Sequence, residues 1–201
     1  MRKSKSETAE TRKRIVDTAS VVIMQNGLAA TGIADVMAAA GLTQGGFYRH
    51  FESKEHLAAE ASEAAFEKIF DMMGKQVAGL PPLEAITKIV HLYLHQRLSK
   101  NQDHLCPLVH LGSELPNADE RIKAAANMGY KRTVGHLAGL LQQLQIEQSL
   151  DVADALVATM VGAVTVSRLA LSAASEKSIL NHAESTVQLV LKAALDGRKA
   201  K

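Results

Sequence analysis

Two short apolar segments joined by Gly41-Leu42 place the tightest limit on how this chain can fold. In the first segment, residues 33–40, apolar side chains recur at positions i, i+3, i+4 and i+7, which form one face of a helix, and Thr31 precedes it as the expected cap. Thr43 can cap the second segment, on which two phenylalanines stand four residues apart. Two short helices with inward-facing apolar sides predict a helix-turn-helix, whose second helix is offered to the major groove of DNA.

The remaining sequence favours helix over strand. It contains only four prolines and few aromatic residues, and it is rich in Ala, Leu, Glu, Gln and Lys, which lose little rotamer freedom in a helix. We therefore expect an all-α protein. Further helices are predicted over residues 8–25, 53–77, 83–93, 118–148, 151–173 and 176–195, with a shorter kinked segment at 106–115.

Residues 31–57, TGIADVMAAAGLTQGGFYRHFESKEHL, resemble the signature of the TetR (tetracycline-repressor) family of bacterial transcription regulators. The resemblance implies a regulator, most often a repressor, that binds a palindromic operator in double-stranded DNA as a homodimer and is released by a small-molecule or thiol-reactive effector. It also implies roles for individual residues. Contacts with phosphates are implied for Thr31, Tyr48, His50 and Lys54, and positions facing the bases are implied for Thr43, Gln44, Gly45 and Gly46.

These implied roles agree with the chemistry of the side chains. A Tyr hydroxyl, an imidazole and an ammonium group all donate to phosphate oxygens, and the N-terminus of a helix capped by Ser53 favours a nearby anion. Gln44 can pair with N6 and N7 of adenine, and Arg49 can reach a guanine or a phosphate. The first fourteen residues hold six basic and two acidic groups, a local positive charge that suits a DNA-binding arm.

Two residues depart from the family pattern. Met37 stands where a small alanine is usual, so we expect the two short helices either to lie further apart or to repack around the flexible thioether. Gly46 stands where Thr, Ser or Ala is usual, which removes one contact to a base or a phosphate.

The resemblance divides the chain into a three-helix DNA-binding domain at residues 1–52 and a larger helical domain at residues 53–201 that binds a ligand and dimerises. Dimerisation through the last two helices also has support in the sequence, because residues 152–171 are apolar or small nearly all round. A partner chain that completes a four-helix bundle would cover such faces, and burial within one chain is the alternative. The last helix carries an apolar stripe of Ile179, Ala183, Val187, Val190 and Ala194.

Candidate contacts to the effector come from the middle helices, where the same side chains also suit an ordinary core. They are Phe66, Phe70, Met73, Tyr93, His95, Cys106, His110, Tyr130 and Met160. The resemblance singles out Cys106, since family members that sense electrophiles or oxidants carry a cysteine in this segment. A reactive thiolate needs access and positive surroundings, which His104 and His110 would supply, and an inert buried thiol is the other interpretation.

No metal site and no cofactor are expected. His91 and His95 are i, i+4 neighbours and could ligate a metal ion. They share a helix face with Glu84 and Lys88, however, which favours a solvent-exposed surface. The sequence also identifies no third ligand.

An enzyme and a structural scaffold are the two alternatives to a regulator. An enzyme is disfavoured because the sequence has no glycine-rich phosphate loop, nucleophile elbow or HExxH motif, and a helical scaffold that does not bind DNA is the second alternative.

A cytoplasmic protein without a membrane anchor is expected. The charged N-terminus lacks the apolar core of a signal peptide, and the single cysteine cannot form an internal disulfide. The most apolar stretch, residues 155–167, is shorter than the roughly 18 residues that span a bilayer, so it is interpreted as a buried helix.

Overall fold

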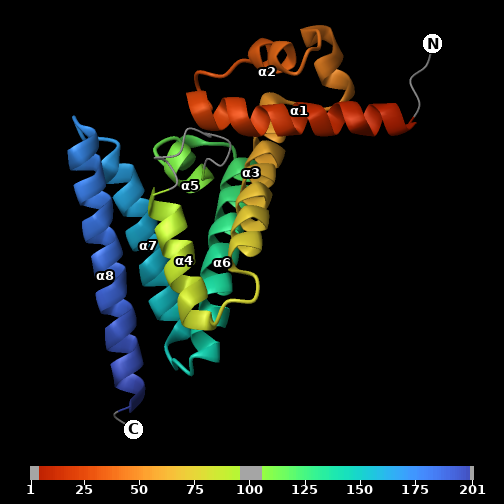
Figure 1. Ribbon diagram of the computed structural model, residues 1–201. Coiled ribbons are helices and arrows are strands. Elements are labelled where there is room, and N and C mark those ends of the chain that lie inside the picture. Colours follow the sequence, from red (N-terminus) through yellow and green to blue (C-terminus); the bar gives the residue numbers. More distant parts are fainter. Residues whose placement is uncertain (1–4, 96–105, 200–201) are drawn as a thin grey trace. The chain divides into compact units, whose positions relative to one another are not determined.

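The computed structural model describes residues 5–95 and 106–199, and the regular secondary structure within these ranges is helical throughout (Figure 1). The all-α prediction is therefore confirmed, while His104 lies outside the described residues. In chain order the elements are α1 (Lys5–Asn26), α2 (Ile33–Ala39), the 3-10 helix η1 (Gln44–Arg49), α3 (Lys54–Val77), α4 (Pro82–His95), α5 (Pro107–His110), the 3-10 helix η3 (Leu115–Asn117), α6 (Glu120–Gln143), α7 (Ser149–Ser167) and α8 (Ala173–Lys199).

The chain divides into two compact units. The first consists of residues 1–69 and 103–129, and the second of residues 70–102 and 130–201. Helices α3 and α6 therefore each contribute residues to both units. The division at residues 52 and 53 that the resemblance implies concerns function, and it stays a prediction.

The core of the first unit joins α1 to the two short helices that follow it. Four apolar side chains of α1 are fully buried against residues of α2, η1 and the start of α3, so the predicted helix-turn-helix is built on α1. Residues that come much later in the chain complete this core. Its larger members are Ile15, Ile23, Met24, Val36, Met37, Phe47, Phe51, Leu57, Leu111 and Ile122.

Glycines and a serine set the ends of these helices. Gly27 ends α1 with a φ of 90° and Gly41 follows α2 with a φ of 69°, a left-handed conformation that glycine adopts without strain. Ser53 caps α3 as predicted, since its Oγ accepts the N–H of His56 at 3.2 Å. The predicted cap of α2 is wrong by one residue: Gly32 holds that position, and its N–H donates to Asp35 Oδ2 at 2.8 Å.

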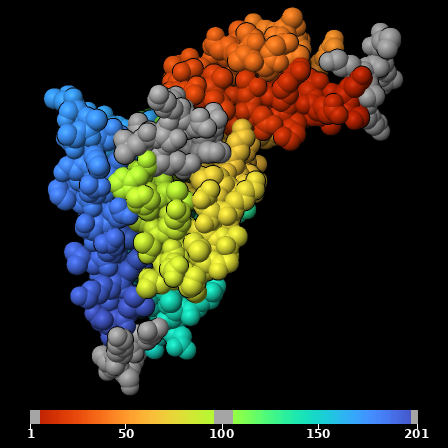
Figure 2. Space-filling model, in the orientation of Figure 1, coloured from red at the N-terminus to blue at the C-terminus, as the bar shows by residue number. Residues whose placement is uncertain are grey.

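Helices α4, α7 and α8 pack together in the second unit, and α7 and α8 run side by side (Figure 1). The space-filling view shows α4, in yellow-green, directly against α8, in blue (Figure 2). Helix α6 ends at Gln143, five residues earlier than predicted, because Gln145 takes a φ of 60° and the chain turns. The turn buries Ile146, whose N–H donates to the carbonyl of Leu141 at 3.2 Å.

Helix α7 ends at Ser167, six residues earlier than the predicted end at residue 173, and it is longer than the apolar stretch at 155–167. It begins at Ser149, two residues before the predicted cap Asp151, and its 19 residues are long and apolar enough, by length and composition alone, to cross a membrane. Core helices of soluble proteins meet the same test. One face of α7, which includes Leu156, Val157 and Met160, is buried inside the second unit.

Candidate nucleic-acid interface

The short helix η1 presents one face to solvent and fixes the other in the core. Phe47 is fully buried on the inner side and packs against Phe51, with the ring centroids 5.6 Å apart. Tyr48, by contrast, is 70 % exposed, and its ring meets the Phe47 ring edge to face at 5.1 Å. The buried phenylalanine therefore holds an exposed aromatic side chain in place, and the Tyr48 hydroxyl is available to an outside partner.

Most of the residues that the resemblance implies lie on this outer face. Thr43, Gln44, Gly45 and Arg49 are exposed, and Gly46, His50 and Lys54 are half-buried. Thr31 differs from the others, because its side chain is buried and its hydroxyl donates to the carbonyl of Gly27 at 2.7 Å. In this structure Thr31 thus ties the end of α1 to the start of α2.

The two departures from the family pattern lie against each other. Met37 is buried, and its terminal methyl lies 3.7 Å from the position that a Cβ on Gly46 would occupy. The long thioether therefore fills the space beside a residue that has no side chain. This contact fits repacking around the thioether, and a wider separation of the two short helices stays a prediction.

A charged cluster connects α1 to α3 behind the short helices. The Arg12 guanidinium donates to both carboxylate oxygens of Glu60, at 2.6 and 2.5 Å, and lies over the Phe51 ring at 4.7 Å from its centroid. His56 Nε2 lies 2.8 Å from the same carboxylate. The hydrogen bonds from Arg12 are the main reason that the pKa of Glu60 lies below its usual value.

A second carboxylate holds the loop between α1 and α2. Glu114, from the segment after α5, accepts the N–H groups of Leu28 and Ala29 at 3.0 and 2.7 Å. A side chain on Gly27 would collide with it, since a Cβ there would lie 2.6 Å from Glu114 Oε1. The sequence offered no signal for this contact, because 86 residues separate Glu114 from Leu28.

The nine candidate effector contacts fall into both compact units. Phe66, Cys106 and His110 belong to the first and the other six to the second. Phe66 and Met73 are buried, as is Met160, whereas the rest of the nine are half-buried.

Some of these side chains have specific partners within their own unit. The Arg132 guanidinium lies 4.2 Å from the centroid of the Phe70 ring, and the Tyr130 hydroxyl donates to Asp154. That hydrogen bond is the main cause of the raised pKa of Tyr130. Cys106 caps the short helix α5, and its carbonyl accepts the N–H of His110 at 3.0 Å.

Comparison with known proteins shows that the segment containing this interface is similar in sequence to transcription regulators. The family model for bacterial regulatory proteins of the tetR family matches residues 15–61, which include α2, η1 and the start of α3. The HTH-type transcriptional regulator AcrR of Shigella flexneri is 31 % identical over 106 residues, which are 52 % of this chain and 49 % of AcrR. The chain thus spans about half the length of this curated relative.

Solved structures match over most of the chain. A TetR transcriptional regulator from Chloroflexus aurantiacus J-10-FL is 26 % identical, with a TM-score of 0.76 over 91 % of this chain and 96 % of its own. The reduced form of NemR from E. coli shares the fold at 20 % identity, with a TM-score of 0.75 over 88 % and 96 % of the two chains. The family model, the curated regulator and these structures agree with the signature in residues 31–57. These matches make the chain similar to bacterial regulatory proteins of the TetR family, with the family model confined to residues 15–61.

Proposed function

We propose that the protein is a transcriptional regulator that places η1 in the major groove of a palindromic operator. The observation that carries the proposal is the exposed outer face of η1, with Gln44, Tyr48 and Arg49, on an element that Phe47 anchors in the core. Polar side chains held in this way can read base edges and contact phosphates in a fixed register. The similar proteins, AcrR and the regulator from Chloroflexus aurantiacus, are transcriptional regulators, which supports the same function.

The two kinds of DNA contact have different expected signatures. Gln44 reads a base, so Gln44→Ala relaxes the preference at one position in each half-site, at a cost of about 1–3 kcal/mol there. Lys54 contacts a phosphate at the start of α3, so Lys54→Ala weakens binding to all sequences about equally and reduces the salt dependence.

The test begins with selection of bound duplexes from a random DNA pool, followed by titration of the variants against the selected sequence and its single-base changes. Gln142→Ala on the exposed surface of α6 and Lys75→Ala in the last turn of α3 are the matched controls. Wild-type protein that prefers no duplex over random DNA would overturn the proposal. Equal changes of sequence preference in Gln44→Ala and Lys54→Ala would overturn the assignment of roles.

The operator is bound by a homodimer that forms through the last two helices. The predicted stripe on α8 is already partly covered within the single chain, because Val187 is buried and the rest of the stripe is half-buried. Other apolar residues of these two helices and the turn between them remain exposed, among them Leu169 at 77 % and Leu189 at 68 %. Exposed leucines on α8 and on the turn before it favour coverage by a second chain.

An effector bound by the helical domain releases the operator. Helix α3 is uninterrupted from Lys54, a proposed phosphate contact, to Val77, so displacement of its C-terminal part also moves its N-terminal end. A coupling free energy of about 1–3 kcal/mol lowers operator affinity roughly 5- to 150-fold. The nine candidate effector contacts named from the sequence are the first positions to test by mutation. A regulator of this kind meets its operator in the cytoplasm.

Cys106 separates the two kinds of effector. It is half-buried and is the single cysteine of the chain, so treatment with diamide or an alkylating agent acts on one site only. Loss of operator binding in wild type, with binding retained in Cys106→Ser, supports a thiol switch. Equal behaviour of the two proteins assigns the effector site to a ligand that binds without a covalent bond.

A further inference from the structure

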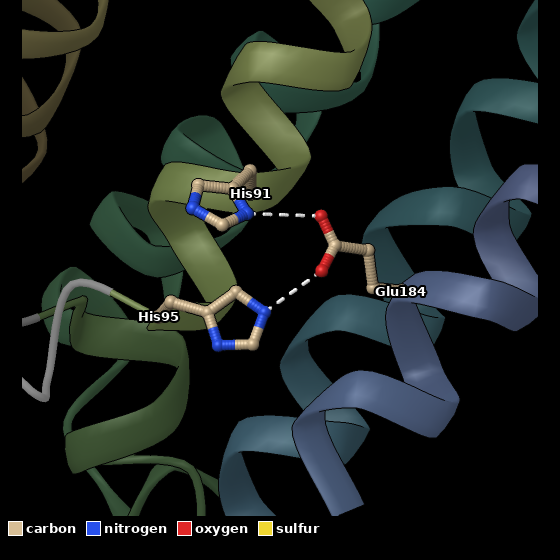
Figure 3. Close-up of side chains that lie close together, drawn as sticks. All are labelled: His91, His95 and Glu184. Atoms are coloured by element: carbon tan, nitrogen blue, oxygen red, sulfur yellow. Dashed lines mark hydrogen bonds and ion pairs between the residues drawn. The ribbon is translucent and has the colours of Figure 1, made fainter. Parts of the chain in front are cut away.

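Two histidines and a glutamate from separate helices converge on the outer side of the second unit. His91 and His95 lie one turn apart on α4, and Glu184 lies on α8 (Figure 3). The carboxylate faces both imidazoles: His91 Nδ1 is 3.0 Å from Oε1, and His95 Nε2 is 2.9 Å from Oε2. Sequence reasoning missed the third member because 89 residues separate His95 from Glu184.

The three residues form a chemically consistent ligand set. Imidazole nitrogens suit Zn²⁺, Cu²⁺, Ni²⁺ and Fe²⁺, and two histidines with one carboxylate are a recurrent set for zinc with an open coordination position. Histidines at i and i+4 on one helix are also a known way to place two ligands on one side of an ion. The pKa of Glu184 is lowered: burial is the largest effect and raises it, but the hydrogen bonds from His95 and His91 outweigh burial. The carboxylate form that a metal needs is thus the favoured one.

The distances suit a single ion after small side-chain movements. One ligand atom from each residue lies within 4.8 Å of the others. In a tetrahedral site with bonds of about 2.1 Å, ligand atoms are about 3.4 Å apart. The two nitrogen-to-oxygen distances, 3.0 and 2.9 Å, therefore open by a few tenths of an ångström, and a separation of 4.8 Å closes by about 1.4 Å through side-chain rotation. The side chains of His95 and Glu184 are 13 % and 20 % exposed and that of His91 is 56 % exposed, which leaves a side open for a water molecule as fourth ligand.

We propose that His91, His95 and Glu184 bind one divalent transition-metal ion per chain, with Zn²⁺ the preferred ion among those available to cells, and that this ion ties α4 to α8. Binding replaces the two N–H to carboxylate hydrogen bonds by coordination bonds. A neutral imidazole shifts its proton to the other ring nitrogen, which for the exposed His91 can face water. This site is independent of η1, so it stands or falls separately from operator binding.

The test uses the full chain without a histidine tag, treated with a chelator and then titrated with Zn²⁺ by calorimetry and with Co²⁺ by visible absorption. One ion per chain and the d–d bands of a low-coordinate Co²⁺ centre are expected. Loss of an outer-shell partner of a metal ligand already lowers affinity about 10- to 100-fold, so His91→Ala and His95→Ala should each lower it at least about tenfold. Glu184→Gln should do the same, although its amide oxygen can still accept one of the two hydrogen bonds.

The control is His182→Ala, which removes an exposed histidine from α8 two residues before Glu184. It should bind the ion with wild-type affinity. Zinc should raise the melting temperature of wild type and of His182→Ala but not that of His91→Ala, because an ion that binds only the folded chain stabilises it. The proposal is overturned if wild type binds no ion at micromolar Zn²⁺, or if His91→Ala and His182→Ala bind Zn²⁺ equally well.

Discussion

Gly129 lies where the Phe66 ring leaves no room for a side chain, and substituting it tests how tightly α3 and α6 pack in the first unit. A Cβ on Gly129 would lie 2.2 Å from Phe66 Cε2 and 2.3 Å from Cζ, far inside van der Waals contact. The ring has little freedom to move aside, because Phe66 is only 4 % exposed. We therefore expect Gly129→Ala to destabilise the protein.

The size of the effect follows from two opposing contributions. Replacing a glycine inside a helix by alanine stabilises it by about 1 kcal/mol through backbone propensity alone. Forcing an extra methyl group into a packed core costs about 1–3 kcal/mol. Gly135 provides the matched control on the same helix, since a Cβ there meets no atom within 4 Å. The difference in unfolding free energy between the two alanine variants isolates the packing cost, about 1–3 kcal/mol.

Urea unfolding followed by circular dichroism measures this difference, at one protein concentration because a dimer's stability depends on concentration. Gly135→Ala should be as stable as wild type or more stable, and Gly129→Ala should be less stable than Gly135→Ala. In a Phe66→Leu background the cost of Gly129→Ala should shrink, since the ring is gone. Equal stability of Gly129→Ala and Gly135→Ala would refute the packing argument.

Glu60 has a lowered folded-state pKa, so its contribution to stability is present above its ordinary pKa of 4.5 and is lost as the pH falls through the folded value. The gap in unfolding free energy between wild type and Glu60→Gln should therefore close in acid, and a gap that stayed constant from pH 7 to pH 3 would contradict this. Glu114→Ala removes the acceptor of two loop N–H groups, a contact that we call the Glu114 clamp, and should lower the unfolding free energy by about 1–3 kcal/mol in the same urea assay. An unchanged unfolding free energy would show that the clamp does not stabilise the fold. Leu189→Asp should shift sedimentation toward the monomer, whereas Leu83→Asp, on the exposed surface of α4, should not; a dimer retained in both places the interface elsewhere.

Local sequence rules predicted the helices, including η1, and they failed at the cap of α2 and at contacts between distant segments. The period of apolar residues and the glycines at 27 and 41 predicted α1, α2 and η1 because the determining contacts lie within a few residues. The cap of α2 was missed because the Thr31 hydroxyl donates to the carbonyl of Gly27, and Gly32 takes the cap position with its N–H donated to Asp35. The pattern of apolar residues does not show which of several neighbouring polar residues takes the cap position.

Contacts between distant segments were out of reach for the same reason. The Arg12 pair with Glu60 spans 48 residues, and the third member of the histidine cluster comes from the last helix. In the sequence, Arg12, Glu60 and Glu184 each have the pattern of an ordinary exposed residue. The outer face of η1 was accessible to sequence reasoning because the buried anchor Phe47 and the exposed residues around it lie within a single short segment.

The clamp from Glu114 has a consequence for protein engineering. The loop that leads into α2 is held by a side chain from beyond α5, and Leu111 and Ile122 fill the same core as Phe47. A hybrid regulator made by joining residues 1–52 to the helical domain of another protein would leave two backbone N–H groups without their acceptor and an apolar surface uncovered. A chimera that keeps the DNA specificity of this protein needs residues 106–122 as well as the N-terminal segment. The DNA-binding part is therefore discontinuous in sequence, and residues 1–52 alone do not make it up.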